Sequence, residues 1–392
     1  MKGNALVVHG GAPTAVLNAS LYGVIRQARE CGEIGCIYGA LGGSAGVLKE
    51  RFTKLGTAKE EWLEQLLTTP ASVIGTSRYC LETEDYDRMA EVIGRNRIRF
   101  VFINGGNGSM DACGKLHEAC RRKGVEAAVV GIPKTMDNDI AVTDHAPGYG
   151  SAARYIAAGT AELCCDVAGL PIHVAVLETM GRDAGWVAAA SSLAGDSGIP
   201  GPDLIYVPER AFEEERFLAD VEGLIRRKGC GVVVASEGLR DASGDPIAEP
   251  VMTSGRSVYF GNVAEYLAGL IIKRLGYKAR SEKPGILGRA CIALQSDTDR
   301  REAVEAGREA VRAAVSGKTG VMVGFRRQDL PEYETQTILI PIKDVMLTEK
   351  RLPEEFINEE GNGVTQAFQE WCRPLLGGPT PRFASFCTQE DS

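Results

Sequence analysis

The sequence has few histidines, no block of basic residues and no long apolar segment. Its four histidines form no spacing with cysteine that is typical of a zinc site. No apolar stretch approaches the roughly 18–20 residues that span a bilayer. The formal net charge of −8 at pH 7 has the wrong sign for a general nucleic-acid or acidic-membrane binder. We therefore expect neither partner, and an anionic substrate would need a local cluster of Arg and Lys.

The eleven cysteines include no CxxC pair and are scattered through apolar patterns. Such cysteines are typical of reduced thiols in a cytosolic protein. The first residues, MKGNALVVHGGAP, predict a short strand and a glycine turn, without the apolar region and cleavage site of a signal peptide. We therefore expect a cytoplasmic location.

Short apolar runs alternate with helical patterns along most of the chain. The runs that predict strands lie at residues 5–11, 98–106, 125–133, 172–181 and 229–238. Continuous apolar runs are typical of strands that are covered on both faces, so we predict an α/β fold with mostly parallel sheets. Ligands of such open sheets bind beyond the carboxyl ends of the strands, which is where the unusual polar clusters of this chain fall.

Glycines in the segment APGYGSAA indicate a domain boundary near residues 148–152. We expect residues 1–148 and 149–289 to form two α/β domains. Helix and strand patterns return after about residue 290, so residues 290–345 are expected to complete the first domain. Residues 346–392 are expected to form a C-terminal extension.

Two of the strand exits are rich in glycine: GGAPT at residues 10–14 and GGNGS at residues 105–109. Glycines let backbone N–H groups approach a ligand closely, and the N-terminus of a following helix favours anions. Neither segment fits GxGxxG or the P-loop pattern GxxxxGK[ST]. Each segment could equally be an ordinary turn, with Ser109 as a helix cap.

A third exit, PKTMDND at residues 133–139, combines a cation, a hydroxyl and two carboxylates. Asp137 and Asp139 could divide the work of a general base and a metal ligand. Lys134 could neutralise the charge on a phosphate, and Thr135 could donate to a phosphoryl oxygen. The alternative is a solvated turn stabilised by its Asp and Asn side chains.

Further polar residues follow other apolar runs. They are Arg78 in GTSRY, Met180-Gly181-Arg182 after Glu178, and Glu237 in VVVASEGL. A lone Arg is usually a surface residue, so these positions carry meaning only in combination. Together with the three exits they would build a phosphate-binding crevice with a general base, which is what phosphoryl transfer requires.

At these segments the chain resembles the phosphofructokinase family over nearly its whole length. GGAPTAVLNAS resembles the family's first glycine loop, GTSRY its donor-phosphate segment, INGGNGSM its GGDGS-type loop, PKTMDND its PKTIDND-type catalytic segment and ETMGRDAGW its substrate-contacting segment. The tail INEEGNGVTQAFQEWCRPLLGG resembles the longer, pyrophosphate-type members. The resemblance implies two Rossmann-like domains, the first binding the phosphoryl donor and the second the sugar phosphate, with the active site in the cleft between them.

The resemblance also implies roles for individual residues. Asp137 would deprotonate the sugar 1-hydroxyl, Asp139 would lie beside it near Mg²⁺, and Lys134 would act with them in catalysis. The residues implied for the phosphoryl donor are Gly11, Arg78, Gly108 and Ser109. Those implied for fructose 6-phosphate are Thr135, Met136, Asp137, His173, Met180, Gly181, Arg182, Glu237, Arg280 and Arg289. Asn107 would occupy the magnesium-associated position, where many relatives have Asp.

Three residues depart from the family pattern. Asn107 lacks the charge of an Asp, so a metal there would be held mainly by the donor's phosphates. His173 stands where relatives carry an Arg or Lys that reaches a neighbouring subunit's substrate, and Ile286 stands where the bacterial ATP enzymes place His. The altered phosphate pocket leaves open a different acceptor, such as sedoheptulose 7-phosphate.

Two residues favour different phosphoryl donors. In the family, Lys at position 134 accompanies pyrophosphate use, whereas Gly at position 108 leaves space for the α-phosphate of ATP. At an effective dielectric of about 20, a charge pair at 4 Å is worth roughly 4 kcal/mol, so the placed ammonium is the stronger signal. We predict pyrophosphate as the donor, with ATP as the alternative.

The predicted function is therefore the reversible, Mg²⁺-dependent transfer of a phosphoryl group to the 1-hydroxyl of fructose 6-phosphate, a step of glycolysis. The family's shared active sites imply a homodimer or homotetramer, with His173 and Arg280 crossing the interface. The departures at residues 107, 173 and 286 leave a non-catalytic sugar-phosphate sensor as a second hypothesis. A dinucleotide-binding oxidoreductase is disfavoured because the GxGxxG fingerprint is absent.

Overall fold

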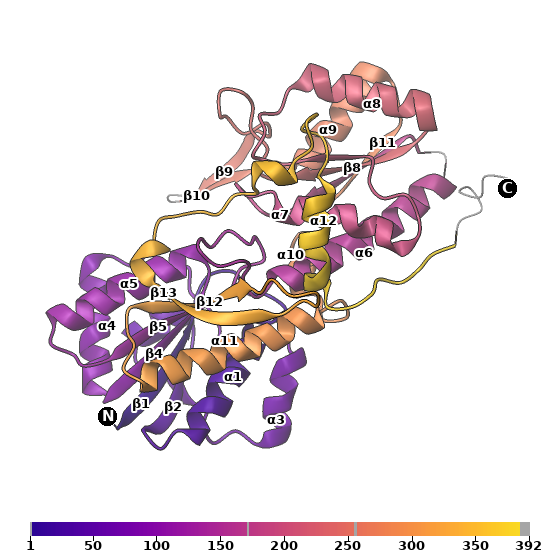
Figure 1. Cartoon of the computed structure of the whole chain (residues 1–392). Helices are drawn as coiled ribbons and strands as arrows, with labels where there is room; N and C mark the ends of the chain where they lie inside the picture. The colour runs from indigo at the N-terminus through magenta and orange to yellow at the C-terminus, as the bar shows by residue number, and fades with distance from the viewer. Residues whose placement is uncertain (1, 171, 255–256, 385–392) are drawn as a thin grey trace. The chain divides into compact units, whose positions relative to one another are not determined.

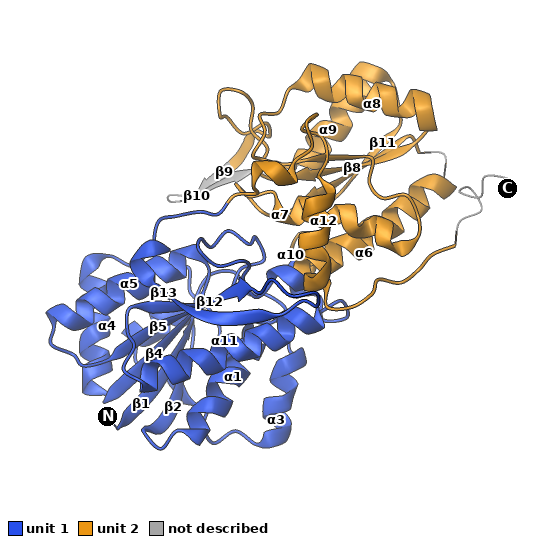
Figure 2. Ribbon diagram, in the orientation of Figure 1, with its two compact units in different colours: residues 1–151, 289–350 blue, residues 152–288, 351–392 orange. Residues whose placement is uncertain are grey.

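The computed structural model describes residues 2–170, 172–254 and 257–384, and the chain divides into two compact units. Unit 1 comprises Met1–Ser151 and Arg289–Lys350, and unit 2 comprises Ala152–Gly288 and Arg351–Ser392 (Figure 2). The chain passes from one unit to the other within α6 (Tyr149–Gly169), within α10 (Ile286–Ala290) and after Lys350. The segment after residue 350 is therefore part of unit 2.

Among the described residues, unit 1 contains a seven-stranded sheet in the order β13-β12-β5-β4-β1-β2-β3 (Figure 1). The strands are β1 (Gly3–His9), β2 (Ile34–Ala40), β3 (Phe52–Lys54), β4 (Ile98–Gly105), β5 (Ala128–Pro133), β12 (Val321–Arg327) and β13 (Thr335–Pro341). The five central strands are parallel, and β3 and β13 pair antiparallel at the two edges. The prediction of an α/β fold with mostly parallel sheets is confirmed.

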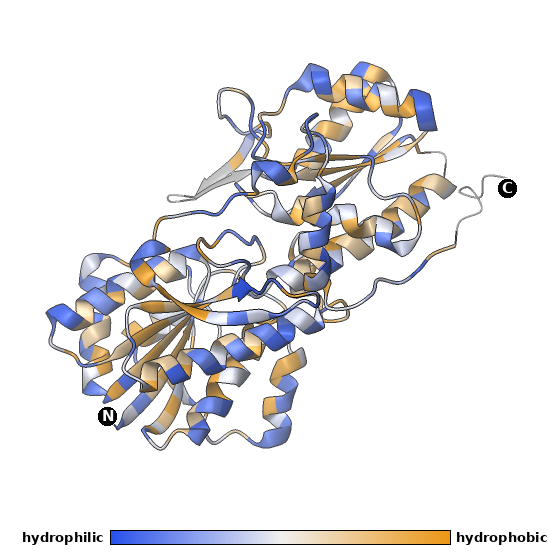
Figure 3. Ribbon diagram, viewed as in Figure 1, coloured by the Kyte–Doolittle hydropathy of each residue, from blue (hydrophilic) through white to orange (hydrophobic). Residues whose placement is uncertain are grey.

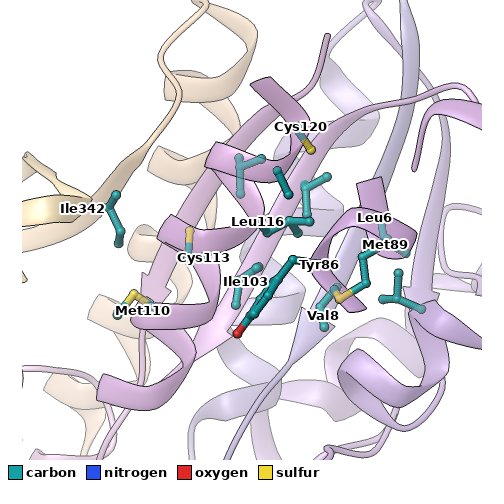
Figure 4. Close-up of a cluster of buried hydrophobic side chains, with 14 of the residues drawn as sticks. Leu6, Val8, Tyr86, Met89, Ile103, Met110, Cys113, Leu116, Cys120 and Ile342 are labelled. Atoms are coloured by element: carbon teal, nitrogen blue, oxygen red, sulfur yellow. The ribbon is translucent and has the colours of Figure 1, made fainter. Parts of the chain in front are cut away.

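Helices cover both faces of this sheet. One face carries α1 (Leu17–Glu30), α3 (Glu60–Gln65), η1 (Leu66–Thr68) and α11 (Asp297–Val315), and the other carries α2 (Gly43–Leu48), α4 (Thr83–Arg95), α5 (Asn107–Arg122) and η4 (Ile342–Asp344). Figure 4 shows the second layer, where Met89, Met110 and Leu116 lie with Leu6 and Ile103 of the sheet. This burial explains why the strands read as continuous apolar runs.

The return segment, residues 289–350, is fastened to the first part of the chain by close helix packing. A Cβ at Gly307 of α11 would lie 2.1 Å from the carbonyl oxygen of Ser20, and a Cβ at Gly23 of α1 would lie 2.0 Å from that of Val304. Two glycines therefore let α1 and α11 approach backbone to backbone, which larger side chains would prevent.

Unit 2 contains, in its described part, a parallel sheet in the order β11-β6-β8-β7 and the ribbon β9-β10. The strands are β6 (Val174–Thr179), β7 (Leu204–Tyr206), β8 (Gly231–Ser236), β9 (Pro250–Ser254), β10 (Ser257–Phe260) and β11 (Ala279–Glu282). The remaining helices are α7 (Trp186–Ala190), η2 (Ser191–Ser197), α8 (Glu214–Lys228), α9 (Val263–Leu270), η3 (Ile271–Leu275), η5 (Glu354–Phe356), α12 (Gln366–Cys372) and η6 (Arg373–Leu376).

The strands of the two parallel sheets are coloured largely as hydrophobic, and α8 is hydrophilic at both ends (Figure 3). Every residue of β6 and β8 is buried, as expected for parallel strands covered on both faces. Among the described residues, no helix has the length and apolar character needed to cross a membrane.

Candidate active site

Three of the polar strand exits meet at one edge of the unit 1 sheet. The strands β1, β4 and β5 are adjacent and parallel, with His9 opposite Asn104 and Gly105 opposite Pro133. Because parallel strands end at the same edge, GGAPT, GGNGS and PKTMDND leave the sheet side by side. The sheet order thus brings GGAPT beside PKTMDND, which lies more than a hundred residues later in the sequence.

The two glycine loops interlock around Ser109. A Cβ at Gly10 would lie 2.2 Å from Ser109 Oγ, and a Cβ at Gly105 would lie 2.1 Å from the same atom. Gly11 has a φ of +70°, and a Cβ there would lie 3.8 Å from Lys134 Nζ. A Cβ at Gly108, in contrast, would meet nothing within 4 Å. Gly10 and Gly105 permit close packing, Gly11 permits the positive φ, and Gly108 borders open space.

Lys134 links the exit of β5 to the first glycine loop. Its side chain is buried, and its ammonium donates a hydrogen bond to the carbonyl oxygen of Ala12. Burial lowers the pKa of Lys134 to about 8, although the charges of Asp137 and Asp139 oppose this shift; the charge of Arg289 adds to it. A cation, two carboxylates and a guanidinium therefore act on one another electrostatically at this edge.

Asp139 is held by two side chains, Thr135 of its own exit and Asn107 of the GGNGS exit. The Thr135 hydroxyl donates to Asp139 Oδ1 at 2.8 Å, and Asn107 Nδ2 donates to Asp139 Oδ2 at 2.8 Å. The backbone N–H of Asp137 donates to Thr135 Oγ1 at 3.0 Å. Thr135 therefore orients the Asp139 carboxylate and holds the backbone of Asp137, which remains only partly buried. Its neighbour Met136 is buried.

The pair Asn107 and Asp139 fits a divalent cation. Asn107 Oδ1 is buried and has no hydrogen-bond partner among the described residues. An amide oxygen beside a carboxylate is a suitable but incomplete ligand set for Mg²⁺, which usually takes one or two carboxylates and completes its shell with substrate phosphates and water. Within the described part of the chain, no group of three or more His, Cys, Asp or Glu residues could hold a metal.

Arg78 lies exposed in the loop that runs past the end of β1. The loop is tied to this strand, since His9 Nδ1 is 2.8 Å from Ser72 Oγ. A Cβ at Gly43 would lie 2.5 Å from the carbonyl oxygen of His9 and 2.8 Å from the backbone nitrogen of Ser77. The residue before Arg78 is therefore packed against the strand end that leads into GGAPT.

The exits of β6 and β8 form a second group, in unit 2. The Glu237 N–H donates to the carbonyl oxygen of Thr179 at 2.9 Å, and a Cβ at Gly238 would lie 1.6 Å from the carbonyl oxygen of Arg182. Burial, and then the charge of Glu178, raise the pKa of Glu237. Gly181 and Arg182 both have positive φ, of 143° and 48°. Met180, Gly181, Arg182 and Glu237 therefore lie together.

His173 and Arg280 are not part of this second group. His173 directly precedes β6, and Arg280 pairs with Ala175 near the start of that strand. At about 3.3 Å per residue, the length of β6 separates them from its polar exit. Arg280 lines a cavity of about 560 Å³ with Ile172 and Tyr277, and the His173 ring packs edge-on against the Tyr277 ring.

The sequence analysis did not identify two lysines that contact the candidate site residues or their neighbours. Lys283 lies 2.6 Å from the buried Glu178 carboxylate, and Lys350 donates hydrogen bonds to the segment that carries the two aspartates. The position of Lys283 inside KARSEKPGILGR, between two arginines, could have suggested a role. The segment around Lys350 carries no comparable sequence signal, because the contact depends on the return of the chain to unit 1.

Comparison with known proteins identifies the family of this arrangement. Residues 4–314 match the family model described as Phosphofructokinase. The chain is 36% identical over 390 residues to the pyrophosphate–fructose 6-phosphate 1-phosphotransferase of Xanthomonas campestris pv. campestris (strain B100), covering 97% of this chain and 93% of that protein.

Two further proteins extend the comparison. The crystal structure of a pyrophosphate-dependent phosphofructokinase from Nitrosospira multiformis is similar with a TM-score of 0.89 and 35% identity, covering 98% of this chain and 94% of that chain. A sulfofructose kinase of Alkalicoccus urumqiensis is 32% identical over 372 residues, covering 94% of each chain.

Proposed function

Because the chain belongs to the phosphofructokinase family, we propose that it transfers a phosphoryl group from pyrophosphate to the 1-hydroxyl of fructose 6-phosphate, giving fructose 1,6-bisphosphate. The observation that carries this proposal is the Lys134 ammonium, buried between the first glycine loop and the carboxylates of Asp137 and Asp139. The relatives named above for pyrophosphate favour the same donor.

The residues of unit 1 divide the work of phosphoryl transfer. Asp137, which is partly exposed, takes the proton of the attacking hydroxyl as the general base. Lys134 neutralises the charge that develops on the departing phosphate, in a buried setting where a charge acts strongly. The N–H groups of the two glycine loops, together with Gly11, Gly108 and Ser109, receive the donor phosphates, and Arg78 adds a second cation.

We propose that Mg²⁺ binds beside Asp139 and Asn107, where the buried amide oxygen accepts no hydrogen bond within the described residues. A bound Mg²⁺ would neutralise charge on the phosphoryl oxygens. Thr135 holds the Asp139 carboxylate at 2.8 Å, so this carboxylate presents a fixed orientation. Removal of divalent cations with a chelator should abolish turnover, and Mg²⁺ should restore it.

The donor is tested by assaying the purified protein with pyrophosphate and with ATP in parallel, using fructose 6-phosphate as the acceptor. We expect higher kcat/KM with pyrophosphate, because its leaving group is a small, highly charged phosphate that Lys134 stabilises. A preference for ATP would overturn the choice of donor. Gly108→Asp should then remove activity with ATP selectively, since it fills the open space beside Gly108.

We propose that Met180, Gly181, Arg182 and Glu237 bind the acceptor, and that Thr135 and Met136 also contact it. The phosphate of the acceptor would be held by Arg289, and by His173 and Arg280. A sulfofructose kinase is among the relatives, and sedoheptulose 7-phosphate is a further candidate acceptor. A phosphate monoester carries about −1.5 to −2 charge at pH 7, whereas a sulfonate carries one. Assays with pyrophosphate as the donor and with fructose 6-phosphate, sedoheptulose 7-phosphate or sulfofructose as the acceptor decide among them.

His173 and Arg280 lie at the far end of β6 from Met180. We therefore propose that they act in the active site of a second copy, in a homodimer or homotetramer. Mixing an Arg280→Ala protein with an Asp137→Asn protein should restore part of the activity that each has lost, because one site of a mixed dimer is intact. Absence of restoration in a mixed oligomer would contradict this assignment.

Two points complete the proposal. We expect the protein in the cytoplasm, on the evidence of its scattered cysteines, and the reaction to run in glycolysis. Calorimetric binding of fructose 6-phosphate without turnover on any donor would favour the sugar-phosphate sensor instead. The departures at Asn107, His173 and Ile286 are what motivate that alternative.

A further inference from the structure

The segment that carries the aspartates has a strained backbone. Asn138, between Asp137 and Asp139, has a φ of +53°, and Val142 has a φ of +68°. Positive φ is tolerated by Asn but is costly for a β-branched residue. Such a backbone persists only where surrounding contacts hold it in place. The position of the Asp137 carboxylate therefore depends on what fastens residues 137–144.

Lys350, the last residue of unit 1, donates four hydrogen bonds to residues 138–144. Its ammonium donates to Asn138 Oδ1 at 3.3 Å, to the carbonyl oxygen of Thr143 at 3.0 Å and to that of Asp144 at 2.7 Å. Its backbone N–H donates to the carbonyl oxygen of Asp139 at 2.7 Å. The preceding residue, Glu349, forms an antiparallel bridge with Ile140. Residues 349 and 350 therefore hold both ends of the strained segment.

We propose that Lys350 is a positioning residue for phosphoryl transfer, fastening residues 138–144 so that Asp137 and Asp139 keep the geometry that the reaction needs. This inference rests on the proposed function, because it takes those two carboxylates to be the reacting ones. Lys350 itself touches neither substrate nor metal in this assignment. It acts through the backbone of the segment.

The electrostatic surroundings support this role. Burial lowers the pKa of Lys350 to about 7, against the attraction of Asp144 and Asp139. The Asp144 carboxylate is shared with His145 and Arg327, at 2.8 and 3.2 Å. An ammonium has three N–H donors and matches the three acceptors around it, whereas a neutral amine has only two. These hydrogen bonds join residues 138–144 to the end of unit 1.

The test compares the full-length wild type with Lys350→Met under identical conditions. A displacement of the base by a fraction of an ångström should lower kcat by about 10- to 100-fold. KM for fructose 6-phosphate and pyrophosphate should change little, because the donor loops and unit 2 are unaltered. Hydrogen exchange should become faster in the peptide that covers residues 137–146.

Lys343→Met is the matched control. Lys343 is exposed on η4, close in sequence to Lys350. Its substitution by Met removes the same charge and changes the side-chain length in the same way. We expect wild-type kcat and wild-type hydrogen exchange from this variant.

Asn138→Gly provides a second variant in case Lys350→Met does not fold. Glycine accepts the positive φ, and the substitution removes the side-chain amide, whose Oδ1 accepts hydrogen bonds from Lys350 and from the Ala146 N–H. We expect a smaller fall in kcat in the same direction, and a non-additive effect in the double variant.

Three results would overturn the proposal: wild-type kcat in Lys350→Met, a fall in kcat with unchanged exchange of residues 137–146, or strict additivity with Asn138→Gly. A wild type without activity on any donor would instead contradict the proposed function. The exchange measurement would still test the fastening in that event.

Discussion

At the scale of single residues, the chemistry depends on a few side chains that other residues hold in place. Thr135 and Asn107 both bind the Asp139 carboxylate, and Thr135 also accepts a hydrogen bond from the backbone N–H of Asp137. The sequence alone predicted that these residues take part in catalysis, and it predicted that the Thr135 hydroxyl donates to a phosphoryl oxygen. In the structure its hydroxyl donates to Asp139, and a direct substrate contact by Thr135 stays a prediction.

Replacing Asp137 by Asn should lower kcat by about 10²–10⁴, because an amide cannot accept the proton of the sugar hydroxyl. The fold should be unaffected, since the contact of Asp137 with Thr135 uses the backbone N–H. Steady-state kinetics and thermal unfolding measure the two effects. Asp329→Asn, at an exposed carboxylate, is the control, and full activity in Asp137→Asn would rule out this residue as the base.

Replacing Lys134 by Met should separate activity from stability. We expect kcat/KM for pyrophosphate to fall by about 10²–10³, the usual cost of removing one preorganised donor of a buried site. The folded-state pKa of about 8 lies below the ordinary value of 10.5, so burying the ammonium destabilises the fold below pH 8. This cost disappears as the pH rises from about 8 to above 10.5.

Lys134→Met should accordingly unfold at no lower temperature than the wild type at neutral pH, and any advantage should shrink toward high pH. Thermal unfolding across this pH range measures it. Lys318→Met, at an exposed lysine, controls for the loss of a charge. A large loss of stability together with the loss of activity would mean that Lys134 is mainly structural.

At the scale of elements, the glycine loops differ in what their glycines do. Gly105 ends β4 and faces Ser109 in the first turn of α5, whereas Gly108 borders open space. The sequence showed three glycines in four positions and could not distinguish these roles, because each depends on atoms of another element. The spacing of a glycine motif therefore predicts a loop better than it predicts which glycine is required.

The pair Gly105→Ala and Gly108→Ala tests this difference. A Cβ at Gly105 would lie 2.1 Å from Ser109 Oγ and 2.9 Å from the carbonyl oxygen of Gly10, so overpacking should destabilise the protein by about 1–3 kcal/mol. Gly108→Ala should be neutral or stabilise α5 by about 0.5–1 kcal/mol. Denaturant unfolding measures both values, and equal effects of the two changes would contradict the packing argument.

At the scale of the whole molecule, an ion cluster joins the return segment to the first part of the chain. The buried His145 ring lies 2.8 Å from Asp144 and 2.6 Å from Glu302 of α11. Glu302 also accepts hydrogen bonds from Tyr333 and Thr335. His145 and Glu302, which are more than 150 positions apart, thus belong to one network inside unit 1. No local sequence pattern predicts this network.

The stability contributed by this cluster should depend on pH. Burial opposes a charged ring at His145, but Glu302 and Asp144 outweigh it and raise the pKa to about 9 from 6.5. The contribution, on the order of 3 kcal/mol, is therefore complete below pH 6.5 and is lost as the pH rises through about 9.

The difference in unfolding free energy between the wild type and His145→Gln measures this contribution. It should be largest near pH 6 and should narrow as the pH passes 9. Taking the difference removes the opposing effects of Lys134 and Lys350, which are present in both proteins. A difference that does not vary with pH would mean that His145 is neutral in the folded protein.

The sequence by itself determined the α/β class, the strands that lead to the polar exits, and the family. These features depend on residues close together in the sequence: apolar runs, glycine spacing and short motifs can be identified without the structure. Tertiary structure alone decided that the GGAPT, GGNGS and PKTMDND segments leave adjacent strands, and that Lys350 contacts the segment that carries the aspartates. Strand order and the return of a distant segment arise from packing between elements, and the spacing of residues along one chain does not encode them.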